Sequence, residues 1–178
     1  MSELDLIKGC LADDQGCHKK IFHRYGGKMF AICLRYMGSR VDAEDVLQEA
    51  FVRIFQNLNR FRGEGSLEGW MRRIVINTAL QALRSKGIHP VEAELEQAAQ
   101  ASVPAAALAH LAEHDLLNLV AALPPGYRLV FNLYAIEGYT HGEIAQLLQI
   151  KESSSRSQLA KARQLLQKQL AHLHRMAV

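Results

Sequence analysis

The chain has 178 residues and a net charge of +3, and 49% of its residues are hydrophobic. That apolar share is typical of a folded protein and argues against global disorder. No apolar run reaches the roughly 20 residues that a membrane-spanning helix needs, and the acidic N-terminus lacks the basic segment of a secretory signal. We therefore expect a cytoplasmic protein with one ordinary domain or two small ones.

Charge is distributed unevenly along the chain. Residues 1–86 hold 14 Lys/Arg and 10 Asp/Glu, residues 87–126 hold none and 5, and residues 127–178 hold 7 and 3. Basic ends suit a polyanionic partner, whereas an acidic middle does not. Segment 88–112 is rich in Ala, Glu and Gln and contains two of the four prolines. This composition predicts a linker between a domain at 1–87 and a second domain at 113–178.

Helical spacing recurs throughout and strand signals are sparse, so we predict an all-α protein with an N-terminal helical bundle. The bundle would contain helices at about 4–12, 14–37, 42–58 and 66–86, with a weak point at Gly26–Gly27. Asp42 would cap the third helix. The apolar stripe of that helix is Leu47, Ala50, Phe51, Ile54 and Leu58.

The opposite face of the third helix is polar and begins with an acidic run. Its side chains are Asp45, Gln48, Glu49, Val52, Arg53 and Gln56. A di-metal helical bundle would need Glu-x-x-His pairs, and the sequence has none. A solvated or protein-binding face is therefore favoured over a metal site.

A glycine-rich loop, 61–66, precedes the fourth helix, which Ser66 can cap. One face of this helix is apolar and predicted to be buried. The other face presents a polar stripe about three turns long, formed by Arg73, Asn77, Gln81 and Arg84. Arg, Asn and Gln bind base edges and aromatic rings stack on unpaired bases, so the stripe, Phe61 and Trp70 suit single-stranded nucleic acid. Core packing is the alternative role for the two aromatic residues.

The C-terminal part has the pattern of a helix-turn-helix. Leu123–Gly126 stops one helix and starts another, predicted at Arg128–Glu137, and Gly138-Tyr139 forms a turn. Thr140 and Glu143 make a capping box ahead of a short helix, and a second helix follows from about 152 to 175. The N-terminal side chains of such a second helix meet base edges in the major groove, while basic residues further along contact phosphate. The candidates are Arg128, Ser153, Ser154, Ser155, Arg156, Gln158, Lys161 and Arg163.

Nothing in the sequence builds an active site. There is no P-loop, nucleophile elbow or dinucleotide fingerprint. Cys10, Cys17 and Cys33 match no zinc-site spacing and are expected to be free, buried thiols. We therefore expect no catalysis, no cofactor, no metal site and no small-molecule substrate.

Three stretches, in this order, resemble motifs of one known family. The first stretch is Asp42–Phe51, which reads DAEDVLQEAF. The second consists of Phe61-Arg62-Gly63, then Trp70–Ile74 and Asn77–Ala79. The third consists of Leu123–Pro125, then Tyr139–Ala145 and Ser157–Arg163. Together they are similar to the extracytoplasmic-function (ECF) sigma factors of the sigma-70 family. The resemblance covers nearly the whole chain.

The resemblance implies a transcription initiation factor that binds core RNA polymerase, through its largest and second-largest subunits, and promoter DNA. An anti-sigma protein is a further implied partner. The implied polymerase-binding residues are Asp42, Asp45, Gln48, Glu49 and Arg53. The implied −10 DNA-binding residues are Arg62, Gly63, Glu64, Ser66, Trp70, Arg73, Asn77 and Arg84. The implied −35 DNA-binding residues are Arg128, Thr140, Ser153, Ser154, Ser155, Arg156, Gln158, Lys161 and Arg163.

The sequence departs from the family pattern at two places. The family commonly has Asp where Gln81 stands, and a small capping residue where Lys151 stands. Promoter preference therefore does not carry over to this chain. Two other functions remain open on the residues alone: a helix-turn-helix regulator that binds DNA as a dimer, and a helical-bundle metalloenzyme.

Overall fold

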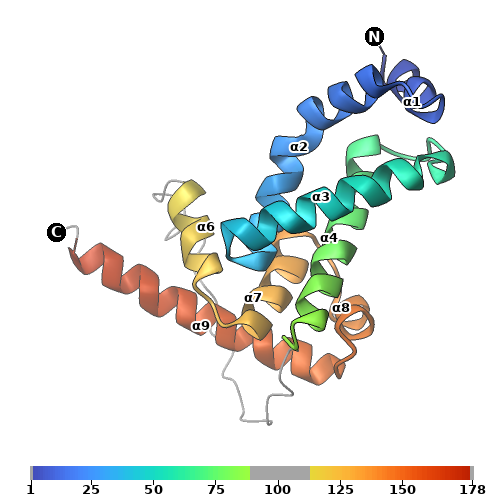
Figure 1. Cartoon of the computed structure of the whole chain (residues 1–178). Helices are drawn as coiled ribbons and strands as arrows, with labels where there is room; N and C mark the ends of the chain where they lie inside the picture. Colours follow the sequence, from blue (N-terminus) through green and yellow to red (C-terminus); the bar gives the residue numbers. More distant parts are fainter. Residues whose placement is uncertain (1, 89–112, 177–178) are drawn as a thin grey trace. The chain divides into compact units, whose positions relative to one another are not determined.

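The computed structural model describes residues 2–88 and 113–176, and all of the regular structure in these ranges is helical. The prediction of an all-α protein is confirmed (Figure 1). The chain divides into two compact units, Met1–Ser85 and Lys86–Val178. We call them unit 1 and unit 2 and describe each by itself.

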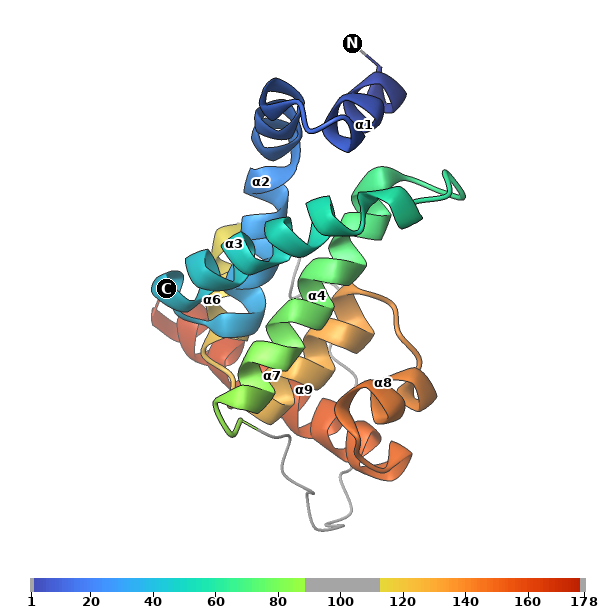
Figure 2. The ribbon, with the colours of Figure 1, turned by 45° about the vertical axis from the view of Figure 1, so that its right-hand side comes forward.

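Unit 1 contains α1 (Glu3–Leu11), α2 (Gln15–Met37), α3 (Arg40–Gln56), the short 3₁₀ turn η1 (Leu58–Arg60) and α4 (Leu67–Ser85). Helices α2, α3 and α4 all pack against one another, as Figures 1 and 2 show from two sides. Their buried faces supply the core, because large apolar side chains there lose nearly all contact with water. Side chains less than 2% exposed include Ile21, Met29, Tyr36, Ile54, Leu67 and Met71.

Most helix boundaries in unit 1 lie close to the predicted ones, but α3 differs at its start. Gly38 takes a left-handed conformation, with φ of 70°, and ends α2. The next helix begins at Arg40 with Ser39 at the N-cap, so the prediction that Asp42 caps it is wrong. Asp42 instead lies in the first turn, where a carboxylate still favours the positive end of the helix dipole.

Two further predictions about unit 1 have clear outcomes. Helix α2 continues without a break through Gly26 and Gly27, so the predicted weak point does not interrupt it. The backbone N–H of Gly69 donates to Oγ of Ser66 at 3.1 Å, which confirms Ser66 as the cap of α4. The predicted apolar stripe is buried at Leu47, Ala50, Phe51 and Ile54 of α3, and its last member, Leu58, is buried in η1.

Unit 2 contains α6 (Glu113–Ala121), α7 (Pro125–Phe131), the π-helical turn η2 (Asn132–Ile136), α8 (His141–Leu148) and α9 (Glu152–Met176). Helix α9 packs against α6, α7 and α8. One apolar cluster in this unit joins Val120, Leu123, Ala162 and Leu166. The side chains that α6 and α9 bury against each other are therefore far apart in the sequence.

The helix predicted at Arg128–Glu137 is divided in the structure. An α-helix ends at Phe131 and a wider π-helical turn follows from Asn132. The capping box is confirmed: Thr140 Oγ1 accepts from the N–H of Glu143, and Glu143 accepts from the N–H of Thr140. Gln149 then turns the chain between α8 and α9 in a left-handed conformation, with φ of 56°.

The predicted linker, 88–112, lies outside the described residues except for position 88. No helix in the described part of the chain is long and apolar enough to cross a membrane. Cys10, Cys17 and Cys33 are free and buried, as predicted. Burial raises the pKa of Cys33 to about 12 and that of Cys10 to about 11, so both thiols remain protonated at neutral pH.

Candidate nucleic-acid interface

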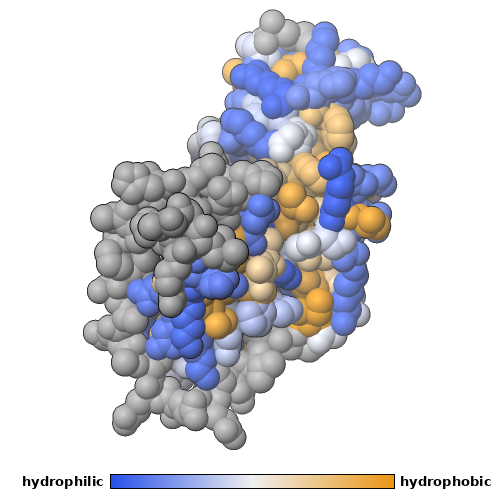
Figure 3. Space-filling model, turned by 90° about the vertical axis from the view of Figure 1, so that its left-hand side faces the viewer, coloured by the Kyte–Doolittle hydropathy of each residue, from blue (hydrophilic) through white to orange (hydrophobic). Residues whose placement is uncertain are grey.

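The polar face of α3 points away from the core of unit 1. Asp45, Gln48 and Glu49 are exposed, and Asp42 is partly exposed. Val41 and Val52 are 68% and 53% exposed, on the same helix. Single exposed apolar residues are normal on a protein surface, so the protein-binding role of this face stays a prediction. Figure 3 shows hydrophobic and hydrophilic side chains side by side on the face that it presents, without assigning them to single helices.

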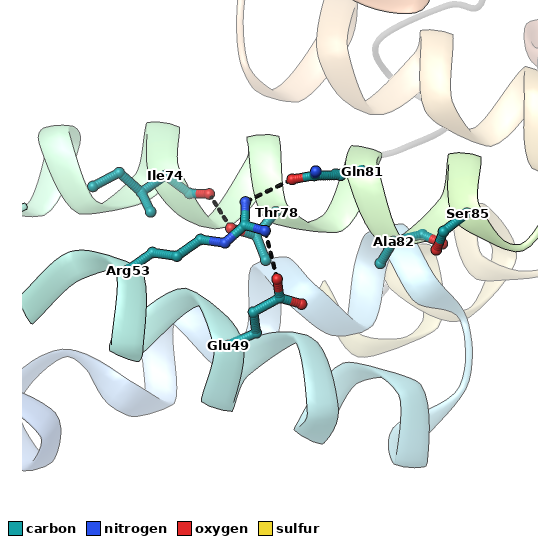
Figure 4. Close-up of polar contacts among 7 residues, drawn as sticks. All are labelled: Glu49, Arg53, Ile74, Thr78, Gln81, Ala82 and Ser85. Carbon is teal, nitrogen blue, oxygen red and sulfur yellow. Dashed lines mark hydrogen bonds and ion pairs between the residues drawn. The ribbon is translucent and has the colours of Figure 1, made fainter. Parts of the chain in front are cut away.

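Arg53, also predicted for this face, turns towards α4. Its Nη1 donates to Oε1 of Gln81 at 2.7 Å, and its Nη2 donates to the carboxylate of Glu49 (Figure 4). The side chain of Arg53 is 34% exposed, against 52% for that of Glu49. The bond to Gln81 could not be predicted from the sequence, because no local spacing relates residues on two different helices.

A hollow of about 300 Å³ lies between the glycine-rich loop and the start of α4. The rings of Phe61 and Trp70 lie 5.6 Å apart, centroid to centroid, and form part of its wall. Gly63 and Gly65 both adopt positive φ angles, 76° and 108°, which other residues rarely adopt. The residues that line the hollow are Arg60, Phe61, Arg62, Glu64, Gly65, Ser66, Gly69, Trp70 and Arg73.

The predicted polar stripe of α4 lies on the surface of unit 1. Arg73, Asn77, Gln81 and Arg84 are all exposed. The opposite face is buried through Leu67, Met71, Val75 and Thr78. The stripe begins at Arg73, which also lines the hollow. Polar donors and an aromatic-walled hollow are therefore continuous along one side of α4, an arrangement that can accept an unpaired base and the strand beside it.

In unit 2, α8, the turn at Gln149 and α9 form the predicted helix-turn-helix. Thr140 is exposed at the N-terminus of α8, where its hydroxyl and N–H both bind Glu143. These hydrogen bonds lower the pKa of the Glu143 carboxyl, so the capping carboxylate stays ionised.

The candidate DNA-binding residues at the start of α9 fall into two groups. Ser153 and Arg156 are exposed, and Lys161 and Arg163 are partly exposed. Ser154, Ser155 and Gln158 are only 6%, 0% and 1% exposed. The DNA contact expected of Ser155 stays a prediction, and its hydroxyl lies inside the unit, 2.9 Å from Nδ1 of His141 on α8.

His141 is the centre of a contact chain that the sequence analysis missed. Its ring stacks on Tyr134 of η2, with centroids 4.5 Å apart, and the guanidinium of Arg163 lies 5.8 Å from the Tyr134 centroid. Burial lowers the pKa of His141, and the positive charges of Arg156 and Arg163 act in the same direction, while Glu152 opposes them. His141 thus joins α8 to η2 and to the start of α9, and Arg163 contacts the same cluster through Tyr134.

Arg128 is more enclosed than the sequence indicated. We expected a phosphate contact at the start of α7, but this residue is only 8% exposed. Its Nη1 donates to the carbonyl oxygen of Ala121 at 2.7 Å, at the C-terminal end of α6. A guanidinium is a good partner for a helix C-terminus, so Arg128 stabilises the junction between α6 and α7.

No group of three or more His, Cys, Asp or Glu side chains that could hold a metal ion occurs in the described ranges. The surfaces above instead present donors, rings and one acidic face, which is the chemistry of macromolecular recognition.

Two family models match separate parts of the chain. Residues 21–88 match the family described as Sigma-70 region 2, and residues 113–166 match Sigma-70, region 4. The first match contains α3, the hollow and α4, and the second contains the helix-turn-helix.

Similar proteins of known name are bacterial sigma factors. The chain is 30% identical to the RNA polymerase sigma-H factor of Pseudomonas aeruginosa, over 97% of this chain and 95% of that protein. It is 31% identical to the ECF RNA polymerase sigma factor SigE of Mycolicibacterium smegmatis, over 85% of this chain but only 61% of that relative's length. The sigma factor RpoE of Bartonella quintana, solved with the anti-sigma factor NepR, shares the fold with a TM-score of 0.53. That comparison covers 86% of this chain and 96% of RpoE at 18% identity.

The two domain matches, together with the similarity to the sigma-H factor over nearly its whole length, show that this protein is a two-domain sigma factor. The chain belongs to the sigma-70 family, in its ECF group. It is a subunit that binds core RNA polymerase and directs it to promoters for transcription initiation.

Proposed function

We propose that the two units perform separate steps of initiation through the surfaces described above. Unit 1 binds core polymerase with the exposed face of α3 and holds the unpaired −10 strand against α4. Unit 2 binds the −35 duplex with the start of α9. The observation that carries this proposal is the continuity of the aromatic-walled hollow with the exposed stripe on α4, while the acidic face belongs to α3.

The polymerase contact uses Asp42, Asp45, Gln48 and Glu49, which occupy the exposed side of α3 together with two exposed valines. Their partner is the clamp helices of the largest subunit. The charges on α3 make a contact with duplex DNA unfavourable, since like charges repel. A protein partner with basic groups fits this face better.

The −10 contact uses the loop residues Arg62, Gly63, Glu64 and Ser66, together with Trp70, Arg73, Asn77 and Arg84. Trp70 offers a ring to an extruded base, and the two positive-φ glycines let the backbone come close to it. Arg73 and Arg84 supply positive charge for the phosphates on either side of the stripe's centre.

The proposed −35 contact uses those of the predicted −35 DNA-binding residues that are exposed or partly exposed. Arg156 is suited to a guanine edge, Ser153 to base or phosphate, and Lys161 and Arg163 to phosphate. Thr140 lies exposed at the N-terminus of α8, where phosphate is favoured by the helix dipole. Ser154 and Gln158 are buried, so they would contact DNA only in a conformation that exposes them.

Protein inhibition and location complete the proposal. RpoE of Bartonella quintana was solved with an anti-sigma factor, and this chain shares its fold. An anti-sigma protein therefore controls this chain too, by covering the surfaces that polymerase needs. The chain acts in the cytoplasm, where polymerase and chromosome lie, and has no catalytic activity of its own.

The test uses purified core polymerase, the full chain and genomic promoter fragments. The expected results are a stable complex on gel filtration and specific run-off transcripts. Asp45→Lys should reduce complex formation, whereas Lys19→Glu, a charge reversal at an exposed position of α2, should leave it unchanged. Absence of a complex with core polymerase, or a two-fold footprint without polymerase, would overturn the proposal.

A further inference from the structure

Arg53 joins the two helices of unit 1 that face different partners in the proposed function. On α3 it binds Glu49, four residues earlier, and on α4 its Nη1 binds Oε1 of Gln81 at 2.7 Å. Figure 4 shows the guanidinium between the two helices with its donors directed to both acceptors. Charge-assisted bonds of this kind are stronger than bonds between neutral groups, so the geometry of Gln81 is restrained.

The chemistry of Arg53 determines which end of the Gln81 amide is bound. A guanidinium has only donors, whereas an amide has one acceptor oxygen and one NH₂ donor group. Arg53 must therefore take the oxygen, and Nε2 must lie on the other side. Figure 4 shows the Gln81 nitrogen on the side away from Arg53.

Gln81 follows Asn77 by one helical turn on the exposed stripe of α4, and it is itself exposed. Its Cβ atom therefore lies on the same face of α4 as those of Arg73 and Arg84. Because Arg53 takes one lone pair of the Gln81 oxygen, the Nε2 donors are the groups that this side chain presents with both of their hydrogens available. Gln81 therefore favours a hydrogen-bond acceptor over a hydrogen-bond donor in the DNA group beside its Nε2.

We propose that Gln81 contacts promoter DNA as a hydrogen-bond donor, and that Arg53, held by Glu49, is the positioning residue that fixes this orientation. The DNA partner is an acceptor atom of the −10 region, on a base edge or on a phosphate. The inference rests on the proposed contact of α4 with −10 DNA and adds to it a residue that determines specificity. It also links the polymerase-facing helix to the DNA-facing helix through one side chain.

The variants separate a positioning role from a simple link between α3 and α4. Gln81→Met has similar length and no hydrogen-bonding groups. Gln81→Glu keeps an acceptor for Arg53 but loses the donors, so a purely structural link would survive it. Arg53→Met and the double variant Arg53→Met/Gln81→Met complete a double-mutant cycle. Each is assembled with core polymerase, and the complex is isolated by gel filtration before DNA is added.

The measurement is selection by these holoenzymes from a promoter library randomised in the −10 region, followed by affinity for the selected fragments at several salt concentrations. Gln81→Met should weaken binding about two- to tenfold, the range of one hydrogen bond. Loss of base preference at one position identifies a base acceptor. Uniform weakening, with a salt slope lower by about one, identifies a phosphate. Arg53→Met should weaken binding, but the double variant should bind no more weakly than Gln81→Met.

Three results would overturn the inference: unchanged affinity and preference in Gln81→Met, wild-type behaviour of Gln81→Glu, or additive effects of Arg53 and Gln81. Asn77→Ala, tested in parallel, separates this inference from the proposed function. If Asn77→Ala weakens binding and the Gln81 variants do not, the −10 contact stands and the role of Gln81 falls. If none of these variants changes binding, both fall.

Discussion

The two helices that we propose as DNA-binding, α4 and α9, present their polar residues in different ways. All four members of the α4 stripe are exposed, whereas Ser154, Ser155 and Gln158 near the start of α9 are buried. Helix α4 has one face packed in the unit 1 core and one face open. Helix α9 is packed by α6, α7 and α8 and leaves a narrower surface for DNA. A polar helix face is thus a reliable sign of exposure only where neighbouring helices contact a single side.

The separation of the two cores can be tested with cavities. Ile54 in unit 1 and Leu133 in unit 2 are both fully buried, and truncation of such side chains to alanine costs about 2–5 kcal/mol. The chain has one tryptophan, Trp70, so its fluorescence reports on unit 1. In urea, Ile54→Ala should lower the midpoint of the Trp70 transition, and Leu133→Ala should leave it unchanged. A large shift with Leu133→Ala would show that the units unfold together.

A second prediction tests the division of α9 into exposed and buried residues. Arg156→Ala should cost the holoenzyme about 1–3 kcal/mol of binding to a promoter with an intact −35 element and relax preference at one base pair. Ser155→Ala should retain the preference, because its hydroxyl bonds to His141. Competition with duplexes substituted in the −35 element measures both. A loss of preference in Ser155→Ala alone would contradict the assignment.

The capping box of α8 should stabilise unit 2 by a smaller amount. Thr140→Ala removes the hydroxyl that accepts from the Glu143 N–H and should cost about 1 kcal/mol. Hydrogen exchange of the α8 amides, measured by mass spectrometry, should become faster. Thr140→Ser keeps the hydroxyl and serves as the control. Equal exchange in all three proteins would mean that the box adds no stability.

The smallest expected effect is a pH dependence confined to unit 2. Burial holds the pKa of His141 below its usual 6.5, with Arg156 and Arg163 contributing and Glu152 opposing. As pH falls through 6.5 the unfolded chain takes up a proton that the folded unit resists, so stability present at higher pH is lost. At pH values below 6.5, the amides of α8 and α9 should become less protected against hydrogen exchange. The loss of protection should be smaller in His141→Gln. His23→Gln, at an exposed position of unit 1, is the control; an unchanged profile in His141→Gln would contradict the prediction.

Sequence patterns predicted the features that depend on local spacing. The stripe at Arg73, Asn77, Gln81 and Arg84, the buried stripe of α3 and the Thr140 box all follow from helical periodicity or from capping chemistry. These features need no knowledge of which helix lies next to which.

Features that depend on tertiary packing escaped the sequence. Helix α3 begins at Arg40, earlier than predicted, because the left-handed conformation of Gly38 ends α2 two residues before it. Arg128 and Ser155 looked like surface polar residues, but Ala121 and His141 bind them inside unit 2. The Arg53–Gln81 bond joins positions 28 residues apart. The implied roles in polymerase and promoter binding came from family resemblance.

The most direct test of the account asks whether polymerase binding and promoter opening depend on different helices of unit 1. The double variant Arg73→Ala/Asn77→Ala should bind core polymerase as well as the wild type on gel filtration. Its holoenzyme should fail to open promoter DNA, measured by permanganate reactivity of unpaired thymines in the −10 region. Normal opening by this variant would contradict the account, and so would loss of the polymerase complex in a variant whose fold is intact.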